Sequence, residues 1–192
     1  MLKKDAIFAA ETDFMKVLVT GAAGFIGSHT AERLKELGHE VIGLDNFSPY
    51  YDIALKKLNA GALSKKNIEV LNLDLRTADL AETLPNDLEY IFHFAAQPGI
   101  SSACTFEDYF SNNILGTQRL ITFAESLPKT PYFVNIATSS IYGLEATFPE
   151  NVAPKPASWY GVTKLAAEQL VLAKTREKKL LATSFRLFSV YG

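Results

Sequence analysis

Tyr160 and Lys164 are a pair of residues whose types and spacing suit acid–base chemistry. They are four residues apart in a segment with helical periodicity, so both side chains would lie on one face of a helix. A phenol with a pKa of ~10 is a poor base at neutral pH, and a nearby ammonium group stabilises its ionised form. Most such pairs are ordinary surface pairs. Thr138, Ser139 and Ser140, however, follow a predicted strand, and its carboxyl end is where open α/β sheets bind ligands. We therefore treat Tyr160 as a candidate base, Lys164 as its partner and these hydroxyls as candidate substrate contacts.

A glycine-rich loop follows the first predicted strand and reads GAAGFIG, with glycines at Gly21, Gly24 and Gly27. This spacing is a variant of the dinucleotide-binding fingerprint, in which the backbone approaches a pyrophosphate at a helix N-terminus. Three glycines can also serve turns that hold no ligand. Asp45 favours the dinucleotide reading because it ends the second predicted strand, 18 residues after Gly27. An acid there can bond the adenosine ribose and repel a 2′-phosphate, which predicts NAD rather than NADP, although a turn or cap role for Asp45 is the alternative.

The elements that must position these residues alternate between strands and helices along the chain. The predicted strands are 16–20, 40–44, 68–72, 90–95, 132–137 and 181–188, and the predicted helices are 25–37, 52–62, 106–127 and 159–178. Such alternation implies right-handed crossovers and a parallel sheet covered by helices on both faces. The sequence thus predicts a doubly wound α/β fold of the Rossmann type over residues 15–192, preceded by an N-terminal extension at 1–14.

The composition of the chain argues against several classes of binding partner. The chain has 192 residues and a net charge of −2, so nothing indicates binding to nucleic acid or to an anionic membrane. Its apolar runs are shorter than a membrane span needs. Cys104 is the single cysteine and cannot form an internal disulfide, and no Cys and His cluster has the spacing of a metal site. These features predict a cytoplasmic protein without a metal. His93, inside a strand, is expected to be a packed and hydrogen-bonded residue.

Seven segments resemble the extended short-chain dehydrogenase/reductases, specifically the NAD-dependent nucleotide-sugar epimerase/dehydratase group. They are GAAGFIG, the strand-end Asp45, HFAAQ (93–97), NNILGT (112–117), SSIYG (139–143), YGVTK (160–164) and RLFSVYG (186–192), in family order. The resemblance implies NAD as cofactor, bound by Gly21, Gly24, Phe25, Ile26, Gly27, Asp45, Asn46, Asp74, Leu75, Phe94, Ala95, Ala96, Gln97, Asn113, Tyr160, Lys164 and Phe188. It also implies that Tyr160 is the base, Lys164 its partner and Thr138 the hydroxyl that shares the proton of the sugar 4-OH, with Ser139, Ser140 and Ser189 at the substrate.

The implied reaction is 4-epimerisation of a nucleotide sugar through a transient 4-keto sugar. The run 45–52 and the run 95–100 are more similar to UDP-glucuronate 4-epimerases than to UDP-galactose 4-epimerases. Ser139 and Ser140 stand where the family's dehydratases carry an acidic pair, which argues against a dehydratase. Ser101 and Ser102 replace a basic residue usual in the uronate epimerases. UDP-glucose, UDP-galactose or an N-acetyl analogue therefore stays open as substrate.

Two alternatives also remain from the resemblance. One is a UDP-sugar decarboxylase or reductase of the same group, which shares the oxidation step. The other is a cofactor-binding part without turnover, because the C-terminal lobe that grips the nucleotide in this family would lie largely beyond Gly192. The resemblance further implies a homodimer that pairs through the predicted helices 106–127 and 159–178.

Overall fold

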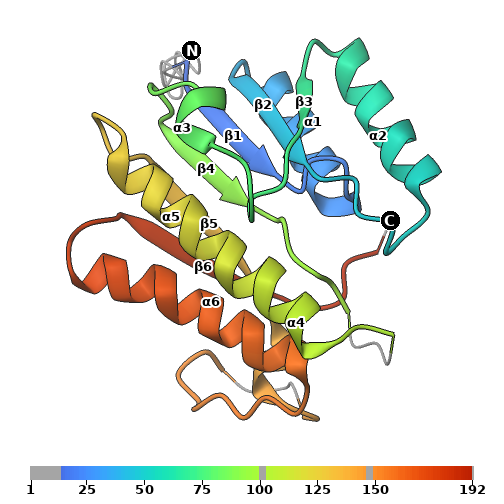
Figure 1. Cartoon of the computed structure of the whole chain (residues 1–192). Coiled ribbons are helices and arrows are strands. Elements are labelled where there is room, and N and C mark those ends of the chain that lie inside the picture. Colours follow the sequence, from blue (N-terminus) through green and yellow to red (C-terminus); the bar gives the residue numbers. More distant parts are fainter. Residues whose placement is uncertain (1–13, 100–102, 146–148, 192) are drawn as a thin grey trace, which may run out of the picture.

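The computed structural model describes residues 14–99, 103–145 and 149–191 and contains one parallel sheet flanked by helices (Figure 1). The strands are β1 (Lys16–Thr20), β2 (Glu40–Asp45), β3 (Glu69–Asn72), β4 (Tyr90–His93), β5 (Tyr132–Thr138) and β6 (Ala182–Leu187). The helices are α1 (Phe25–Glu36), α2 (Ile53–Lys65), α3 (Leu80–Thr83), α4 (Phe106–Tyr109), η1 (Phe110–Leu115), α5 (Gly116–Ser126), η2 (Ser139–Tyr142) and α6 (Trp159–Arg176). The strand order is β3-β2-β1-β4-β5-β6, with every neighbouring pair parallel, which confirms the predicted doubly wound fold.

Two apolar clusters pack against the two faces of the sheet. Successive residues of β1 point to opposite faces, so Val17 and Val19 join one cluster while Leu18 joins the other. The first cluster lies under α1 and α2 and includes Ala31 and Leu63. The second lies under α3, α5 and α6, and Figure 1 shows α5 and α6 side by side over it. Because both faces are covered, inner strands such as β1 and β4 are largely apolar runs rather than alternating patterns.

The predicted helix 106–127 is divided in the structure, which corrects the sequence-based expectation of one continuous helix. A six-residue π-helical segment, η1, separates α4 from α5. A π-helix adds a residue to the turn, and here it turns the buried Asn113 inward. There the Asn113 side chain accepts a hydrogen bond from the backbone N–H of Gln97 (2.7 Å) and donates one to Thr163 (3.1 Å). The short α3 and η2 were not predicted either, since each spans a single turn.

His93 lies at the centre of a buried chain of hydrogen bonds that joins β1 to α5. Thr117 donates its hydroxyl proton to the carbonyl of Asn113 (2.7 Å), so it accepts from Nε2 of His93 (2.8 Å). On the other side of the ring, the Thr20 hydroxyl accepts from the backbone N–H of Ala95 (3.2 Å) and lies 2.8 Å from Nδ1 of His93. In the neutral imidazole the proton is therefore on Nε2, and Thr20 donates to Nδ1. Burial, assisted by the charge of Lys164, lowers the pKa of His93 to about 3. His93 is thus a packed, hydrogen-bonded residue.

Gly27 lies where α1 meets the end of β1, and no larger residue fits there. A Cβ atom at Gly27 would lie 2.2 Å from the carbonyl oxygen of Gly21. We expect Gly27→Ala to lower the free energy of unfolding by about 2 kcal/mol or more, because backbone must shift to relieve the overlap. Gly61 in α2 is the matched control, since a Cβ there meets nothing within 4 Å. Gly61→Ala should raise stability by about 0.5–1 kcal/mol through helix propensity. Urea unfolding of both variants tests this, and a Gly27→Ala variant as stable as wild type would contradict it.

The buried neutral state of His93 predicts a pH dependence of stability. The unfolded chain protonates this histidine near its ordinary pKa of 6.5, whereas the folded chain does so only near about 3. Between these values the unfolded state binds more protons, so the free energy of unfolding should fall as pH falls through this window. His93→Gln should flatten that slope, measured by urea unfolding at several pH values. His29→Gln, at an exposed position on α1, should keep the wild-type slope. Equal slopes in wild type and His93→Gln would overturn the expectation.

Candidate functional site

A cavity of about 360 Å³ opens at the carboxyl edge of the sheet, where β1 lies between β2 on one side and β4, reached by the crossover from β3, on the other. Doubly wound sheets bind ligands at this point because the loops from the two sides diverge there. The predicted residues that line the cavity are Gly21, Gly24, Phe25, Ile26, Gly27, Asp45, Asn46, Asp74, Leu75, Phe94, Ala95, Ala96, Gln97, Thr138, Tyr160, Lys164 and Phe188. The fold therefore brings the glycine loop and the Tyr160 helix to one cavity.

The glycine loop forms one wall of this cavity. Gly21 has a φ of +69°, and a Cβ atom there would lie 2.8 Å from the backbone nitrogen of Ala95. The loop closes with a hydrogen bond from the N–H of Gly24 to the carbonyl of Gly21 (3.0 Å). Helix α1 begins at Phe25, and its N-cap residue Gly24 provides no side-chain cap. The first N–H groups of α1 thus face the cavity with the positive end of the helix dipole, an arrangement that suits a phosphate.

Asp45 lies at the end of β2, and its buried carboxylate is engaged by three donors. Oδ2 accepts from the backbone N–H of Ala23 (3.2 Å), and Oδ1 accepts from the N–H of Phe47 (2.8 Å). Oδ1 also forms an ion pair with Nζ of Lys56 (2.9 Å), which reaches back from α2. Lys56 lines the cavity as well, and the sequence analysis did not single it out. The sequence offered little sign of this role for Lys56, because only the fold shows that this turn of α2 lies over the end of β2.

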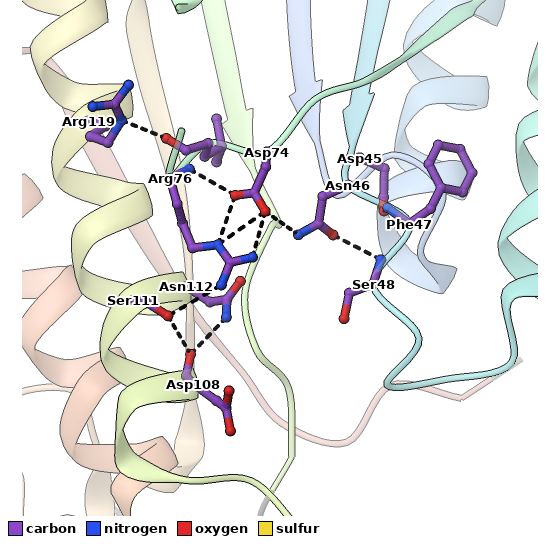
Figure 2. A network of polar contacts seen from close by, with 11 residues as sticks. Asp45, Asn46, Phe47, Ser48, Asp74, Arg76, Asp108, Ser111, Asn112 and Arg119 are labelled. Atoms are coloured by element: carbon purple, nitrogen blue, oxygen red, sulfur yellow. Dashed lines mark hydrogen bonds and ion pairs between the residues drawn. The ribbon is translucent and has the colours of Figure 1, made fainter. Parts of the chain in front are cut away.

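A second paired carboxylate, Asp74, lies at the same end of the cavity (Figure 2). It accepts from the guanidinium of Arg76 (2.6 Å at the shortest contact) and from the side-chain amide of Asn46 (3.2 Å). These bonds, with that of Arg76 first, lower the pKa of Asp74 to about 2. The backbone carbonyl of Leu75, next in the chain, accepts from Arg119 of α5 (2.9 Å). The sequence analysis did not single out Arg76, although it lines the cavity and holds Asp74 in place.

Tyr160 and Lys164 lie at the other end of the cavity, on the first turns of α6. Burial raises the pKa of Tyr160, and a hydrogen bond with Thr138 opposes that rise. The buried Lys164 donates from Nζ to the carbonyl oxygen of Ile136 (2.6 Å), and burial lowers its pKa to about 8. The expected lowering of the phenol pKa by the ammonium is thus not what this structure shows. Lys164 turns toward a strand carbonyl instead, and desolvation dominates at both groups.

A buried ion pair holds α6 against the end of the sheet. Glu168, one turn after Lys164, pairs with Arg186 of β6 (2.7 Å), and its charge opposes the lowering of the Lys164 pKa. Arg186 also donates to the hydroxyl of Tyr142 (2.7 Å), which ends η2. The segment that starts with Ser139, directly after Thr138, is thereby tied to the helix that carries Tyr160. Arg186 therefore helps to set the position of the Thr138 hydroxyl relative to the Tyr160 hydroxyl.

Four predicted site residues lie outside the cavity lining: Asn113, Ser139, Ser140 and Ser189. Asn113 is buried behind the wall, where it supports Gln97, and its neighbour Asn112 lines the cavity. Ser140 positions Thr138, because the Thr138 hydroxyl donates to the Ser140 hydroxyl (3.2 Å) and accepts from the Ser140 backbone N–H (3.2 Å). Ser189 is exposed beyond β6. Besides Lys56, Arg76 and Asn112, the cavity is lined by Leu44, Ser48, Tyr50, Tyr51, Leu73, Pro98, Ile136, Ala137 and Leu187, which sequence reasoning did not assign to a site.

The described residues contain neither a metal centre nor a membrane-spanning helix. Within residues 14–99, 103–145 and 149–191, His, Cys, Asp and Glu side chains do not gather in groups of three or more that could hold a metal ion. None of the helices in this part of the chain combines the length and the apolar character needed to cross a membrane.

Comparison with known proteins identifies relatives along nearly the whole chain. UDP-glucuronate 4-epimerase 4 of Arabidopsis thaliana is 36% identical over 182 residues, which cover 92% of this chain and 42% of that protein. The uncharacterized UDP-glucose epimerase YtcB of Bacillus subtilis is 40% identical over 183 residues, which cover 93% of this chain and 57% of that protein. The chain thus spans about half the length of these relatives.

The fold comparison agrees with the sequence comparison. The crystal structure of a Bacillus cereus UDP-glucuronic acid 4-epimerase in complex with UDP-glucuronic acid and NAD matches with a TM-score of 0.85 and 36% identity. The match covers 93% of this chain and 58% of that one. The sequence model of the NAD dependent epimerase/dehydratase family matches residues 17–192. With the glycine loop, Asp45 and the Tyr160–Lys164 pair gathered at one cavity, the chain belongs to the NAD dependent epimerase/dehydratase family.

Proposed function

We propose that this chain is the NAD-binding part of a UDP-sugar 4-epimerase, an isomerase, and that UDP-glucuronate is its substrate. The observation that carries the proposal is that Tyr160, Lys164 and Thr138 line the same cavity as the glycine loop and Asp45. A redox cofactor and a hydroxyl-bearing substrate would therefore meet in one space. Relatives named as UDP-glucuronate 4-epimerases support the choice of sugar.

The cavity fits a dinucleotide by its own geometry. Its walls include the uncapped N-terminus of α1 for a pyrophosphate, and the close backbone packing at Gly21 and Gly27 fixes the loop that carries this N-terminus. The carboxylate of Asp45 retains acceptor capacity for a ribose hydroxyl, because Oδ2 has a single donor among the described residues. Asn46, Asp74 and Leu75 would flank the adenine end. Phe94, Ala95, Ala96, Gln97 and Phe188 would line the path toward Tyr160.

The chain's own groups supply the proton chemistry. When bound, NAD supplies reversible hydride transfer at C4 of the sugar. Tyr160 would accept the proton of the sugar 4-hydroxyl at its phenolic oxygen. The hydroxyl of Thr138 would bond the sugar O4 and hold it in place. Lys164 has N–H groups beyond the one that bonds Ile136, and its ammonium would stabilise the phenolate once substrate and cofactor exclude water. Ser140 would fix Thr138 in the orientation that this contact requires.

Replacing the proposed base tests the mechanism. Tyr160→Phe removes the one oxygen that would take the proton, so turnover should fall about 10²–10⁴-fold. NAD affinity, measured by isothermal titration calorimetry, should stay within about threefold of wild type, since the phenol is one contact among many. Tyr90→Phe is the matched control, because Tyr90 starts β4 at the opposite end from the cavity. Retained activity in Tyr160→Phe would sink the assignment of Tyr160 as base.

The product identifies the reaction. Incubation with NAD and a panel of UDP-sugars, analysed by chromatography with mass detection, should yield an isomer of unchanged mass from UDP-glucuronate. An isomer of UDP-glucose or of an N-acetyl analogue would keep the epimerase and change the substrate. Loss of carbon dioxide would instead show a decarboxylase. NAD binding without any product would show that these residues bind the cofactor but do not turn over substrate by themselves.

We also propose that the protein acts as a homodimer in the cytoplasm, paired through the helices in 106–127 and 159–178. An exposed aromatic patch supports this face: the ring of Phe106 contacts Phe110 (6.2 Å between centroids) and Trp159 (5.2 Å). Trp159 is 59% exposed, and Leu115 and Val162 add further exposed apolar surface on the same helices. Contiguous apolar patches of this kind mark association surfaces. The lone cysteine suits the reducing cytoplasm.

Phe106→Glu tests the dimer. A charge in the centre of the patch should raise the dimer dissociation constant at least about tenfold, measured by analytical ultracentrifugation. The fold should be preserved, because Phe106 is the first residue of α4, where an acidic side chain suits the helix dipole. Leu58→Glu on α2 is the control, since Leu58 is 69% exposed and lies outside this patch. An unchanged assembly in Phe106→Glu, or an equal loss in Leu58→Glu, would contradict the proposed interface.

A further inference from the structure

The adenosine end of the proposed cofactor site contains two carboxylates, and each is paired with its own cation. Asp45 pairs with Lys56 at 2.9 Å, and Asp74 pairs with Arg76 at 2.6 Å. All four side chains line the cavity. This end of the cavity is therefore neutral in sum, whereas Asp45 considered alone would make it acidic. The charge that a cofactor meets there depends on the pairs rather than on the acid.

Lys56 is placed to contact a ligand as well as Asp45. Its side chain is 15% exposed and reaches the cavity from α2, beside a carboxylate that is 4% exposed. The ammonium has three N–H donors. Among the described residues its one hydrogen-bond acceptor is Oδ1 of Asp45, so the remaining donors are available to a ligand. Limited solvent access weakens screening, so the charge of Lys56 acts strongly on a neighbouring anion.

The two side chains of this pair act in opposite directions on cofactor choice. In dinucleotide-binding folds an acid at the end of the second strand bonds the ribose hydroxyls of NAD, while a nearby cation accommodates the 2′-phosphate of NADP. This chain has both in one ion pair. We propose that Lys56 is a specificity-determining residue: it offsets the repulsion between Asp45 and a 2′-phosphate, and it becomes the phosphate's partner once the charge of Asp45 is removed. The proposal rests on the proposed cofactor function.

A double-mutant cycle measures this role directly. The dissociation constants of NAD and NADP are determined by isothermal titration calorimetry for wild type, Asp45→Asn, Lys56→Met and the double variant. Wild type should favour NAD. Asp45→Asn should lower the ratio of the NADP constant to the NAD constant at least about tenfold, because Lys56 is then free to bind the phosphate. In the double variant most of that gain should disappear. A gain that persists in the double variant would assign the phosphate to Arg76 or to the loss of repulsion alone and would overturn the proposal.

A second comparison keeps the proposal testable if Asp45→Asn does not fold, since Asp45 also accepts backbone bonds from Ala23 and Phe47. Lys56→Met in the wild-type background should raise the same ratio several-fold, and this rise should shrink at high salt. Lys57→Met is the matched control, because Lys57 is exposed and does not line the cavity. Equal ratios in the two lysine variants would overturn the role of Lys56. Failure of wild type to bind NAD would instead overturn the cofactor function on which the inference rests.

Discussion

The close approach of the glycine loop to its neighbours is the constraint on which the rest of the structure depends. Gly27 lies against the carbonyl of Gly21, and Gly21 lies against the backbone of Ala95, so β1, α1 and the end of β4 meet with no room for a methyl group. This contact aims the first turn of α1 into the cavity. It also brings the loop after β4 beside β1, where Thr20 and His93 continue the connection to α5. The cavity floor is thus built from backbone, which side-chain variation alters little.

Charged groups around that floor occur in pairs. Asp74 pairs with Arg76, two residues further along the chain, and both side chains are partly exposed. Asp45 pairs with Lys56 and Glu168 pairs with Arg186, and in these two pairs the carboxylates are buried and the partners come from other elements. Removing one member of such a pair leaves the other charged and desolvated, which costs more than the pair contributes. Lys164 differs, because its nearest acceptor is a neutral carbonyl and its pKa falls to about 8. The paired groups maintain geometry, whereas burial brings the pKa of Lys164 closer to neutral pH.

The sequence predicted the fold well because hydrophobic periodicity and the turn residues are local signals. The glycine loop, Asp45 and the Tyr160–Lys164 pair carry spacing that the fold preserves, and all of them line the cavity. Lys56 could not be found this way, because its ion pair with the end of β2 depends on where α2 lies. Arg76 pairs locally with Asp74, two residues earlier, and only the fold shows that this pair lines the cavity. Burial raises the pKa of Tyr160 and the hydrogen bond with Thr138 lowers it, and residue spacing does not show which of the two effects is larger. The π-helical segment η1 was not predicted, because its apolar pattern resembles that of a regular α-helix.

The π-helical segment η1 separates α4 from α5 within one long helical stretch. A residue added to a turn rotates everything after it by about 100° relative to what precedes it. The aromatic side chains of Phe106 and Phe110 therefore face outward independently of Leu120 and Ala124, which pack into the core from α5. Deleting one residue from η1 would bring the two halves into phase and draw Asn113 away from Gln97. Substitutions on the outer face of α4 and η1 can therefore change the surface contacts of this segment without changing how α5 packs into the core.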